Sequence, residues 1–391
     1  MFGYLIVLGV AVAVTLLCTP LARWIALRIG AVQAPDERRV HARTTPLLGG
    51  AAMYAGFLAA MAVATQVHQF DPVFQDTSEP IAILIGATLI FAVGVIDDLI
   101  EVSAPAKLAG QVLAASVMVL LGVTMLFFRI PFGGYISLSP DLAFFLTVVW
   151  VTGMVTAVNW IDGLDGLAAG IVAIAAGAFA LYSAKLFDLG LLPNDSNSIS
   201  PLIAVITLGL CLGFLPWNFQ PARIFMGESG ASLLGLLMAT STLLVGGQTA
   251  ETTSGSTFFF FAPLFIPIVI MGVPIFDTAF AIIRRASRRE GVANADKGHL
   301  HHRLVRLGHG HRRSVLILWA WTAILSGLAL WPLYTKHGNG FVPLGVAALA
   351  VALYTVLHPE ARRVRAEHHL DRQKAAHEVE AEAEPGQPVG D

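Results

Sequence analysis

The sequence has few charged residues and almost no cysteine. Charged residues make up 13% of the 391 positions, whereas soluble domains carry about 25%. This shortage, together with a hydrophobic fraction of 56%, argues against a soluble globular domain and predicts a polytopic membrane protein. The two cysteines, Cys18 and Cys211, both lie in apolar stretches. Neither a disulfide framework nor a cysteine metal site is therefore indicated.

Other familiar signals are missing too. The first apolar run lacks a preceding basic region and a small-residue cleavage site, so it predicts a retained first helix rather than a removable signal. Neither a sequence repeat nor a second domain is recognisable, and no nucleic-acid partner is predicted. A zinc motif of the HExxH kind is also lacking.

Long apolar runs are abundant. A membrane-spanning helix needs about 20 mostly apolar residues, and eleven segments approach that length. Because the runs are continuous and do not alternate, they predict helices rather than a barrel. The predicted spans cover residues 3–27, 47–67, 81–97, 107–128, 141–160, 164–187, 201–217, 230–248, 257–283, 314–333 and 341–358.

Basic residues divide unequally between the two sides of such a topology. Only Arg129, Lys185 and Lys336, of 24 Lys and Arg residues, fall on one side. The basic side is expected to face the cytoplasm, which places the N-terminus outside and the C-terminus inside. The predicted fold is therefore an all-α polytopic protein of the cell membrane with about 11 transmembrane helices. Residues 1–358 would form the membrane domain, and residues 359–391 a polar, acidic, partly disordered cytoplasmic tail.

Five polar stretches interrupt the apolar pattern, and all five fall on the predicted cytoplasmic side. This coincidence predicts one site assembled at the cytoplasmic membrane surface. Charges near membrane depth are costly and usually functional. The stretches are PDERRVHARTTPLLGG (35–50), GVIDDL (94–99), NWIDGLDGLAAG (159–170), PWNFQPARIFMGESGAS (216–232) and RRASRREGVANADKGHLHHRL (284–304).

The third stretch places Asn159, Asp162 and Asp165 at a spacing of three. On a helix this spacing forms one ridge of oxygen ligands, although solvated acids at a helix end would look similar. Asp97 and Asp98 are adjacent, so they cannot share a helix face and are expected to make different contacts. A helix-end pair of this kind is a weak signal taken alone.

Glu228 adds a further carboxylate between Gly227 and Gly230. Hard oxygen ligands of this kind select Mg²⁺, with Mn²⁺ as an alternative. Since Mg²⁺ commonly binds one or two carboxylates together with substrate phosphates, the acidic cluster also predicts a phosphate-bearing substrate.

The fifth stretch is basic. Its arginines suit a pyrophosphate or nucleotide or, alternatively, anionic lipid headgroups. For its His-x-His-His run we favour phosphate contact or proton handling. Phe225 and Asn218 could stack on and hydrogen-bond a nucleobase, although Phe225 would serve equally well in core packing.

These stretches resemble the polyprenyl-phosphate N-acetylhexosamine-1-phosphate transferases, the glycosyltransferase family 4 type, over about residues 5–330. The resemblance rests on the Asp pair at 97–98, NWIDGLDGLA at 159–168, NFQPARIFMGESG at 218–230 and DKGHLHHRL at 296–304. It implies ten or eleven helices with a cytoplasmic active site. It also implies transfer of a sugar 1-phosphate from a UDP-N-acetylhexosamine to polyprenyl phosphate, with release of UMP.

The resemblance assigns roles to individual residues. Lys107, with Gln111 one turn on, matches a basic position near the phosphates. The implied catalytic residues are Asp97, Asp98, Asp162, Asp165 and His301. The implied substrate-binding residues are Lys107, Asn218, Phe225, His299, His302 and Arg303. The implied metal ligands are Glu228, Asn159, Asp98 and Asp162.

Two departures and one choice accompany the resemblance. Glu228 stands where the family usually has Asp, and Ala231 replaces a frequent serine, which leaves metal preference and rate open. The GHLHHRL and PDERRVHARTTPLLGG stretches resemble the GlcNAc-1-phosphate branch rather than the phospho-N-acetylmuramoyl-pentapeptide branch. UDP-GlcNAc is therefore the expected donor, with the pentapeptide donor as the alternative. A homodimer is compatible with the sequence.

Two other classes compete. A transporter could use acids such as Asp162, Asp165 and Asp277 to relay protons or bind a cation, but transporter sites tend to lie at the midplane. A CDP-alcohol phosphotransferase would need an arginine where Gly170 stands. For a transferase, the sequence does not decide between direct attack by the lipid phosphate and a covalent aspartyl intermediate.

Overall fold

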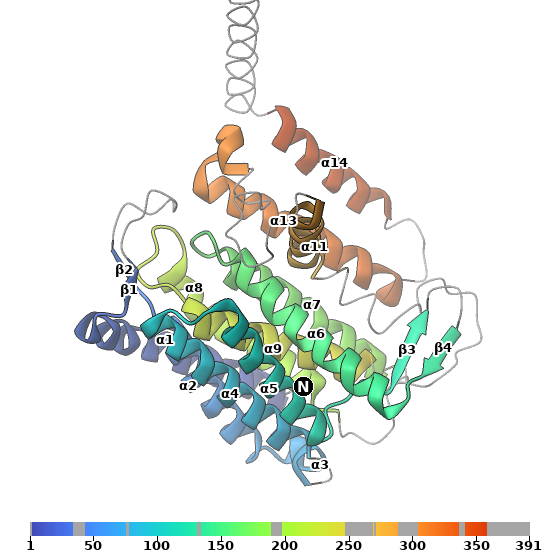
Figure 1. Ribbon diagram of the computed structural model, residues 1–391. Helices are drawn as coiled ribbons and strands as arrows, with labels where there is room; N and C mark the ends of the chain where they lie inside the picture. The colour runs from blue at the N-terminus through green and yellow to red at the C-terminus, as the bar shows by residue number, and fades with distance from the viewer. Residues whose placement is uncertain are drawn as a thin grey trace, which may run out of the picture.

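The computed structural model describes residues 2–33, 44–75, 78–130, 134–188, 198–246, 269, 271–287, 304–335 and 341–357. The described part of the chain is a helical bundle with two short β-hairpins (Figure 1). The tail predicted at 359–391 lies outside the described residues, as does most of the basic stretch at 284–304.

Every described helix except the short α3 overlaps one of the predicted apolar segments. The helices are α1 (Phe2–Ile29), α2 (Gly49–Ala64), α3 (Asp71–Gln75), α4 (Glu79–Ile100), α5 (Ala104–Leu120), α6 (Pro140–Ile161), α7 (Leu167–Asp188), α8 (Ser200–Asn218), α9 (Gly227–Gly246), α11 (Gly272–Ser287), α13 (Gly310–Tyr334) and α14 (Phe341–Leu357). A 3-10 turn, η1 (His68–Phe70), precedes α3, and a π-helical turn, η2 (Val305–His309), precedes α13.

The protein is a multi-pass membrane protein, although the described helices long enough to cross a membrane are fewer than the eleven predicted. Seven helices in the described ranges are long and apolar enough, and an eighth span is obtained if α2 and the η1–α3 segment, bent by 88°, count together. Helices α5 and α14 are apolar but shorter, and the span predicted at 257–283 begins in residues outside the described ranges.

The span predicted at 107–128 ends early. Helix α5 stops at Leu120, and Gly122 follows with φ of +105°, a conformation that glycine tolerates and other residues resist. The chain then forms β3 (Phe127–Ile130), paired antiparallel with β4 (Gly134–Ser137). A second antiparallel pair joins β1 (Val32–Gln33) to β2 (Thr45–Pro46). The all-α prediction thus missed two small strand pairs, of which only β3 overlaps a predicted helix.

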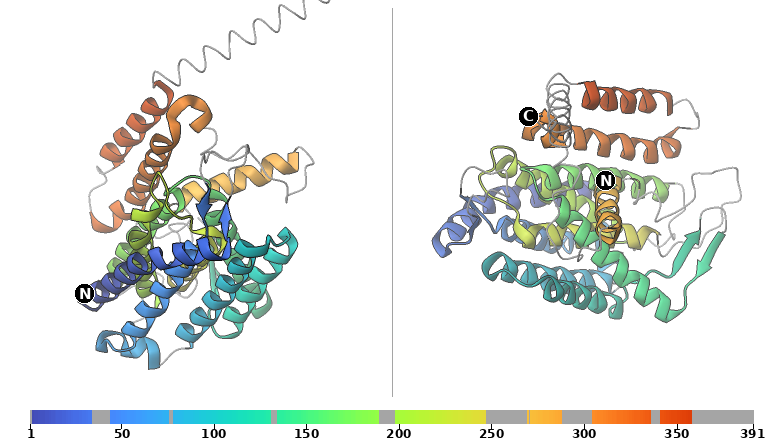
Figure 2. Two further views of the ribbon diagram at one scale, coloured as in Figure 1. Left: turned by 90° about the vertical axis from the view of Figure 1, so that its left-hand side faces the viewer. Right: turned by 45° about the horizontal axis from the view of Figure 1, so that its top comes forward.

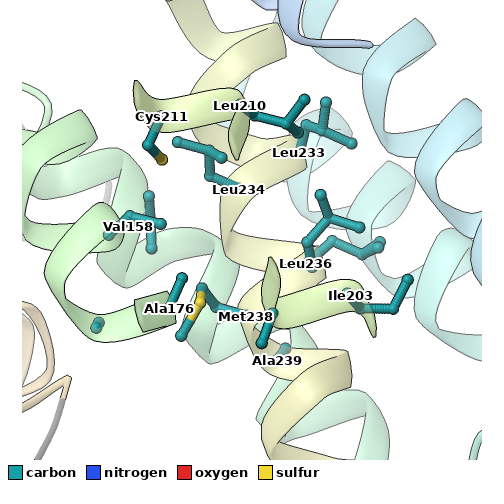
Figure 3. Packing of buried hydrophobic residues seen from close by; sticks show 14 of the residues in the cluster. Val158, Ala176, Ile203, Leu210, Cys211, Leu233, Leu234, Leu236, Met238 and Ala239 are labelled. Carbon is teal, nitrogen blue, oxygen red and sulfur yellow. The ribbon is translucent and has the colours of Figure 1, made fainter. Parts of the chain in front are cut away.

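Helix α9 lies at the centre of the bundle. It packs against α2, α4, α6, α7 and α8. Figure 3 shows its side chains Leu233, Leu234 and Met238 between residues of α6, α7 and α8, among them Val158, Ala176 and Cys211. A helix that is apolar all round is expected in such a position. Its central position fixes the place of its N-terminus, which carries Glu228.

Helices α13 and α14 pack against each other beside the main bundle (Figures 1 and 2). Trp319 of α13 fills the space above Gly170 of α7, where an added Cβ atom would lie 1.9 Å from the indole ring. The same indole donates a hydrogen bond of 3.3 Å to the carbonyl oxygen of Leu167. Gly170 is therefore needed for this close helix packing.

Candidate active site

Helix ends gather at one end of the bundle. There α4, α6 and α8 end while α5, α7 and α9 begin. Three of the polar stretches predicted to share a site, 94–99, 159–170 and 216–232, are joined there by hydrogen bonds. Residues 46–50 join them through backbone bonds to Phe225 and Met226. The structure thus brings the described parts of these four stretches together at one end of the bundle.

Asp97 and Asp98, in the last turn of α4, point to different partners, as their adjacency predicts. One Asp98 oxygen accepts from the backbone N–H of Glu228 at 2.7 Å. The other accepts from the N–H of Ser229 at 3.2 Å and from its hydroxyl at 2.6 Å. Asp98 therefore caps the N-terminus of α9, where free amides and the helix dipole favour an anion.

Backbones approach closely around this cap. A Cβ atom added to Gly94 of α4 would lie 2.4 Å from the Cα atom of Ser229, and one added to Gly50 of α2 would lie 2.3 Å from the nitrogen of Gly230. Gly227 has φ of +71°, and its added Cβ would lie 2.5 Å from the Asp98 carboxylate. Three helices thus meet backbone to backbone, and no side chain fits between them.

Lys107 links two acids from different helices. Its Nζ atom lies 2.7 Å from Oδ2 of Asp97 and 3.6 Å from Oε2 of Glu228. The other Asp97 oxygen accepts from the backbone N–H of Val102 at 2.6 Å, which ties the carboxylate to the turn between α4 and α5. Lys107 is about a quarter exposed, so it is fixed in place yet can still meet a ligand.

Glu228 is the convergence point of the site. Besides Lys107, its carboxylate accepts a hydrogen bond from the side-chain amide of Asn159 at the end of α6. The hydroxyl of Ser232, one turn along α9, lies 3.5 Å from the same oxygen. The side chain remains 16% exposed, so the carboxylate is positioned by three helices and is still accessible.

The ridge predicted for Asn159, Asp162 and Asp165 on one helix is wrong. Helix α6 ends at Ile161, Asp162 is its C-cap, and α7 begins only at Leu167. Gly166 adopts φ of +76° in the turn between them. Asp165 is buried in this turn and accepts from the backbone N–H of Ala222 at 2.9 Å. The three residues still face one region because the chain reverses there.

Asp162 lies just outside the membrane-spanning part of α6. Burial raises the pKa of its carboxyl group to about 7, and the negative charges of Glu228, Asp98 and Asp165 add to the rise. The residue as a whole keeps some exposed surface, so protein surrounds its carboxyl group more than its backbone. The raised pKa therefore reports chiefly the burial of this carboxyl group, with the negative charges around it as the smaller cause.

Asn218 is the last residue of α8, and Phe225 lies in the loop between α8 and α9. The side-chain oxygen Oδ1 of Asn218 accepts a hydrogen bond from the backbone N–H of Gly166 at 3.0 Å, and the side-chain nitrogen Nδ2 donates one to the backbone carbonyl oxygen of Ile224 at 3.1 Å. Asn218, which was predicted to contact the nucleotide, is 2% exposed. Its side chain instead joins the α6–α7 turn to the α8–α9 loop. Phe225 is half-buried, and its backbone pairs with Pro46 and Gly49.

Some predicted residues cannot be placed. His299, His301, His302 and Arg303 lie outside the described residues. Asp277, considered in the transporter alternative, is buried in α11. Sequence reasoning missed Ser229 and the contact glycines Gly50 and Gly94. Gly94, three residues before Asp97, was the one signal in the sequence for a close backbone contact at this helix end.

The family-model match covers the part of the chain that forms this site. The model described as glycosyl transferase family 4 matches residues 80–246, the stretch that contains Asp97, Lys107, Asn159 and Glu228. A decaprenyl-phosphate N-acetylglucosaminephosphotransferase of Mycolicibacterium smegmatis is 37% identical over 90% of this chain and 87% of its own length. The chain belongs to glycosyl transferase family 4.

Two further relatives are similar as well. A probable undecaprenyl-phosphate N-acetylglucosaminyl 1-phosphate transferase of Bacillus subtilis is 36% identical over 79% of each chain. A phospho-N-acetylmuramoyl-pentapeptide-transferase of Mycolicibacterium smegmatis is 30% identical over 83% of this chain and 95% of its own. Identity is thus higher to the N-acetylglucosamine enzymes, and the relatives are transferases rather than transporters.

Proposed function

We propose that this protein transfers N-acetylglucosamine 1-phosphate from UDP-N-acetylglucosamine to a polyprenyl phosphate. The observation that carries the proposal is the 37% identity over nine-tenths of the chain to an enzyme named for polyprenyl-phosphate N-acetylglucosamine phosphotransfer. In this reaction an oxygen of the lipid phosphate attacks the β-phosphorus of the donor. The bond from that phosphorus to UMP breaks, and polyprenyl diphosphate N-acetylglucosamine forms, as the first membrane step of a cell-wall or surface polysaccharide.

The site suits phosphoryl transfer, in which a protein mainly positions its substrates and neutralises charge. Lys107 provides a cation beside Glu228, where the donor phosphates would bind. Asp97 holds Lys107 by their ion pair and the hydrogen bond from Val102. Because the lipid phosphate is already anionic, it needs little help from a general base. We therefore assign Asp97 to positioning Lys107.

We further propose that Mg²⁺, or Mn²⁺, acts at this site. Glu228 and Asp162 would hold the ion, with Asn159 orienting Glu228 through its amide. Among the described residues no three histidine, cysteine or carboxylate residues form a metal-binding group, and Asp98 is occupied by the α9 backbone. This donor set fits Mg²⁺, which commonly keeps waters and takes its remaining ligands from substrate phosphates. When bound, the ion would neutralise charge on the transferring phosphate.

The cytoplasmic face is the proposed location of the site, because the basic residues of the sequence concentrate on the side where these helix ends lie. UDP-sugars are water-soluble, whereas the polyprenyl chain stays in the hydrocarbon phase. A site at the membrane surface would be accessible to both substrates.

The test is UMP release by the purified protein. It would be given Mg²⁺, polyprenyl phosphate and, separately, UDP-N-acetylglucosamine, UDP-N-acetylgalactosamine or UDP-N-acetylmuramoyl-pentapeptide. We expect lipid-dependent UMP from UDP-N-acetylglucosamine, and its loss in Glu228→Gln, which keeps the shape and removes the charge. Release from the pentapeptide donor alone would assign the protein to the other branch. Release from none of them by a folded preparation would refute the proposal.

A further inference from the structure

Gln111 is a buried polar residue whose side-chain oxygen lacks a partner. It lies on α5 and is 7% exposed. Within the described ranges, its Oε1 atom is buried and accepts no hydrogen bond. Such an atom has a free-energy cost, because water no longer solvates it. Buried polar groups without partners are uncommon and call for an explanation.

Gln111 shares a helix face with Lys107. The two residues are four apart on α5, so their side chains lie one above the other. Lys107 reaches Asp97 and Glu228. Since a helix rises 1.5 Å per residue, Gln111 lies about 6 Å further along the axis, away from the end of the bundle that carries the site. It is thus on the membrane side of the acidic cluster.

The same face continues with Ala114, Ala115 and Met118, which are all buried. Packing alone would be served at position 111 by an apolar residue of similar size. Removing an unpaired polar group in this way is often neutral or stabilising. The carboxamide is therefore better explained by a ligand than by the fold.

We propose that Gln111 binds the phosphate group of the polyprenyl acceptor. This inference rests on the function proposed above. The acceptor phosphate is tethered to a chain in the hydrocarbon phase, so it approaches from the membrane side, where Gln111 lies. The nucleotide donor approaches from water, past Lys107 and Glu228.

A carboxamide suits this task for a chemical reason. Rotation about its last side-chain bond exchanges the oxygen for the NH₂ group, which carries two donors. Those donors can bond to anionic phosphate oxygens without adding charge. A carboxylate at this depth would instead repel the phosphate beside Asp97 and Glu228. Gln111 and Lys107 would thus hold the acceptor from two successive turns of α5.

The test compares Gln111→Leu, Gln111→Glu and the wild type. In Gln111→Leu we expect the KM for polyprenyl phosphate to rise about tenfold or more, which is the effect of losing a hydrogen bond to a charged group. The KM for UDP-N-acetylglucosamine should stay within about twofold, and the melting temperature should be unchanged or higher. Gln111→Glu should raise the lipid KM further through repulsion. Met118→Leu, on the same face, is the matched control and should change neither KM.

A second measurement separates this inference from the proposed function. Binding of polyprenyl phosphate, phosphatidic acid and inorganic phosphate would be measured on wild type and Gln111→Leu in phosphatidylcholine nanodiscs without donor. We expect Gln111→Leu to bind polyprenyl phosphate more weakly than the wild type does, and the binding of the other two ligands to be unchanged. Unchanged lipid binding in Gln111→Leu would overturn the inference even if the wild type releases UMP. A fall in melting temperature with both KM values unchanged would make Gln111 structural and would also overturn it. If Gln111→Leu weakens the binding of polyprenyl phosphate selectively but the wild type releases no UMP, the proposed role of Gln111 is supported and the proposed transferase function is refuted.

Discussion

The carboxylate of Asp98 receives both the backbone N–H and the hydroxyl of Ser229, at 3.2 and 2.6 Å. This pair joins the end of α4 to the start of α9, the central helix of the bundle. Asp98 therefore fixes the first turn of α9, which carries Glu228.

Removal of this cap should destabilise the protein. In Asp98→Ala, three donors at the start of α9 lose their acceptor, so we expect a loss of about 2 kcal/mol or more. Ser229→Ala removes only the hydroxyl bond and should cost about 1 kcal/mol. Thermal unfolding in detergent measures both. If the contacts act as described, the double variant is little worse than Asp98→Ala. Additive losses would contradict the pairing.

Gly94→Ala should be strongly destabilising, because its Cβ atom would lie 2.4 Å from the Cα atom of Ser229, a backbone atom that cannot rotate away. Overpacking of this kind costs about 1–3 kcal/mol, more than the helix propensity that alanine gains. Gly153→Ala on α6 is the control, since no atom lies within 4 Å of its added Cβ. That variant should be as stable as the wild type or more so. Equal melting temperatures for the two variants would refute the close approach.

The stability of the metal-free protein should fall as the pH rises. The pKa of Asp162 is raised to about 7 in the folded protein, whereas an unfolded Asp titrates near 3.9. The folded state therefore holds this proton more tightly, and its stabilising effect is lost between about pH 4 and 7. Melting temperatures across this range check the sign, and Asp162→Asn should flatten the curve. A curve as steep in Asp162→Asn as in the wild type would show that another group is responsible.

Added Mg²⁺ should offset this loss. An ion among these carboxylates favours their charged forms, so we expect its stabilising effect to be larger at pH 8 than at pH 5.5. Melting temperatures with and without Mg²⁺ at the two pH values test this expectation. Glu228→Gln should reduce the difference. Equal stabilisation of wild type and variant would place the ion elsewhere.

The site should be accessible from the cytoplasm. Glu101 is exposed beside the Asp97–Lys107 pair, and Asp141 is exposed at the opposite end of α6 from Asn159. In a background without Cys18 and Cys211, Glu101→Cys should react with a membrane-impermeant maleimide in inverted vesicles and be protected in intact spheroplasts. Asp141→Cys should show the reverse. The opposite pattern for both would invert the topology.

The sequence predicted the helices well where hydrophobicity decides the structure. Apolar length located α1, α4 and α6 to within a few residues, because burial in lipid or protein favours such runs as helix. Periodicity failed at Asp162 and Asp165, because Gly166, with its positive φ, permits a turn that the regular spacing does not reveal. Hydrophobicity likewise gave no warning of the β3–β4 hairpin, because β3 is itself apolar.

The sequence predicted where the acidic residues of the candidate site lie better than it predicted which groups they contact. One-sided clustering of acids located Asp97, Asp98 and Glu228 near one another, since charges avoid the membrane interior. Which backbone amide an acid meets depends on how helices distant in sequence pack together. That is why the capping role of Asp98 and the loop-pinning role of Asn218 emerged only from the structure.

The backbone contacts of Gly50 and Gly94 with the first turn of α9 have a consequence for which substitutions this site can accept. A side chain of any size at the crossing would force helices apart, so drift is blocked there. The carboxylate of Glu228 projects from this tightly packed turn and is 16% exposed. A Glu228→Asp exchange would draw the acidic oxygens back by about one bond length without touching the backbone contacts of Gly50 and Gly94. The reach of the carboxylate can therefore change at this site independently of the helix packing beneath it.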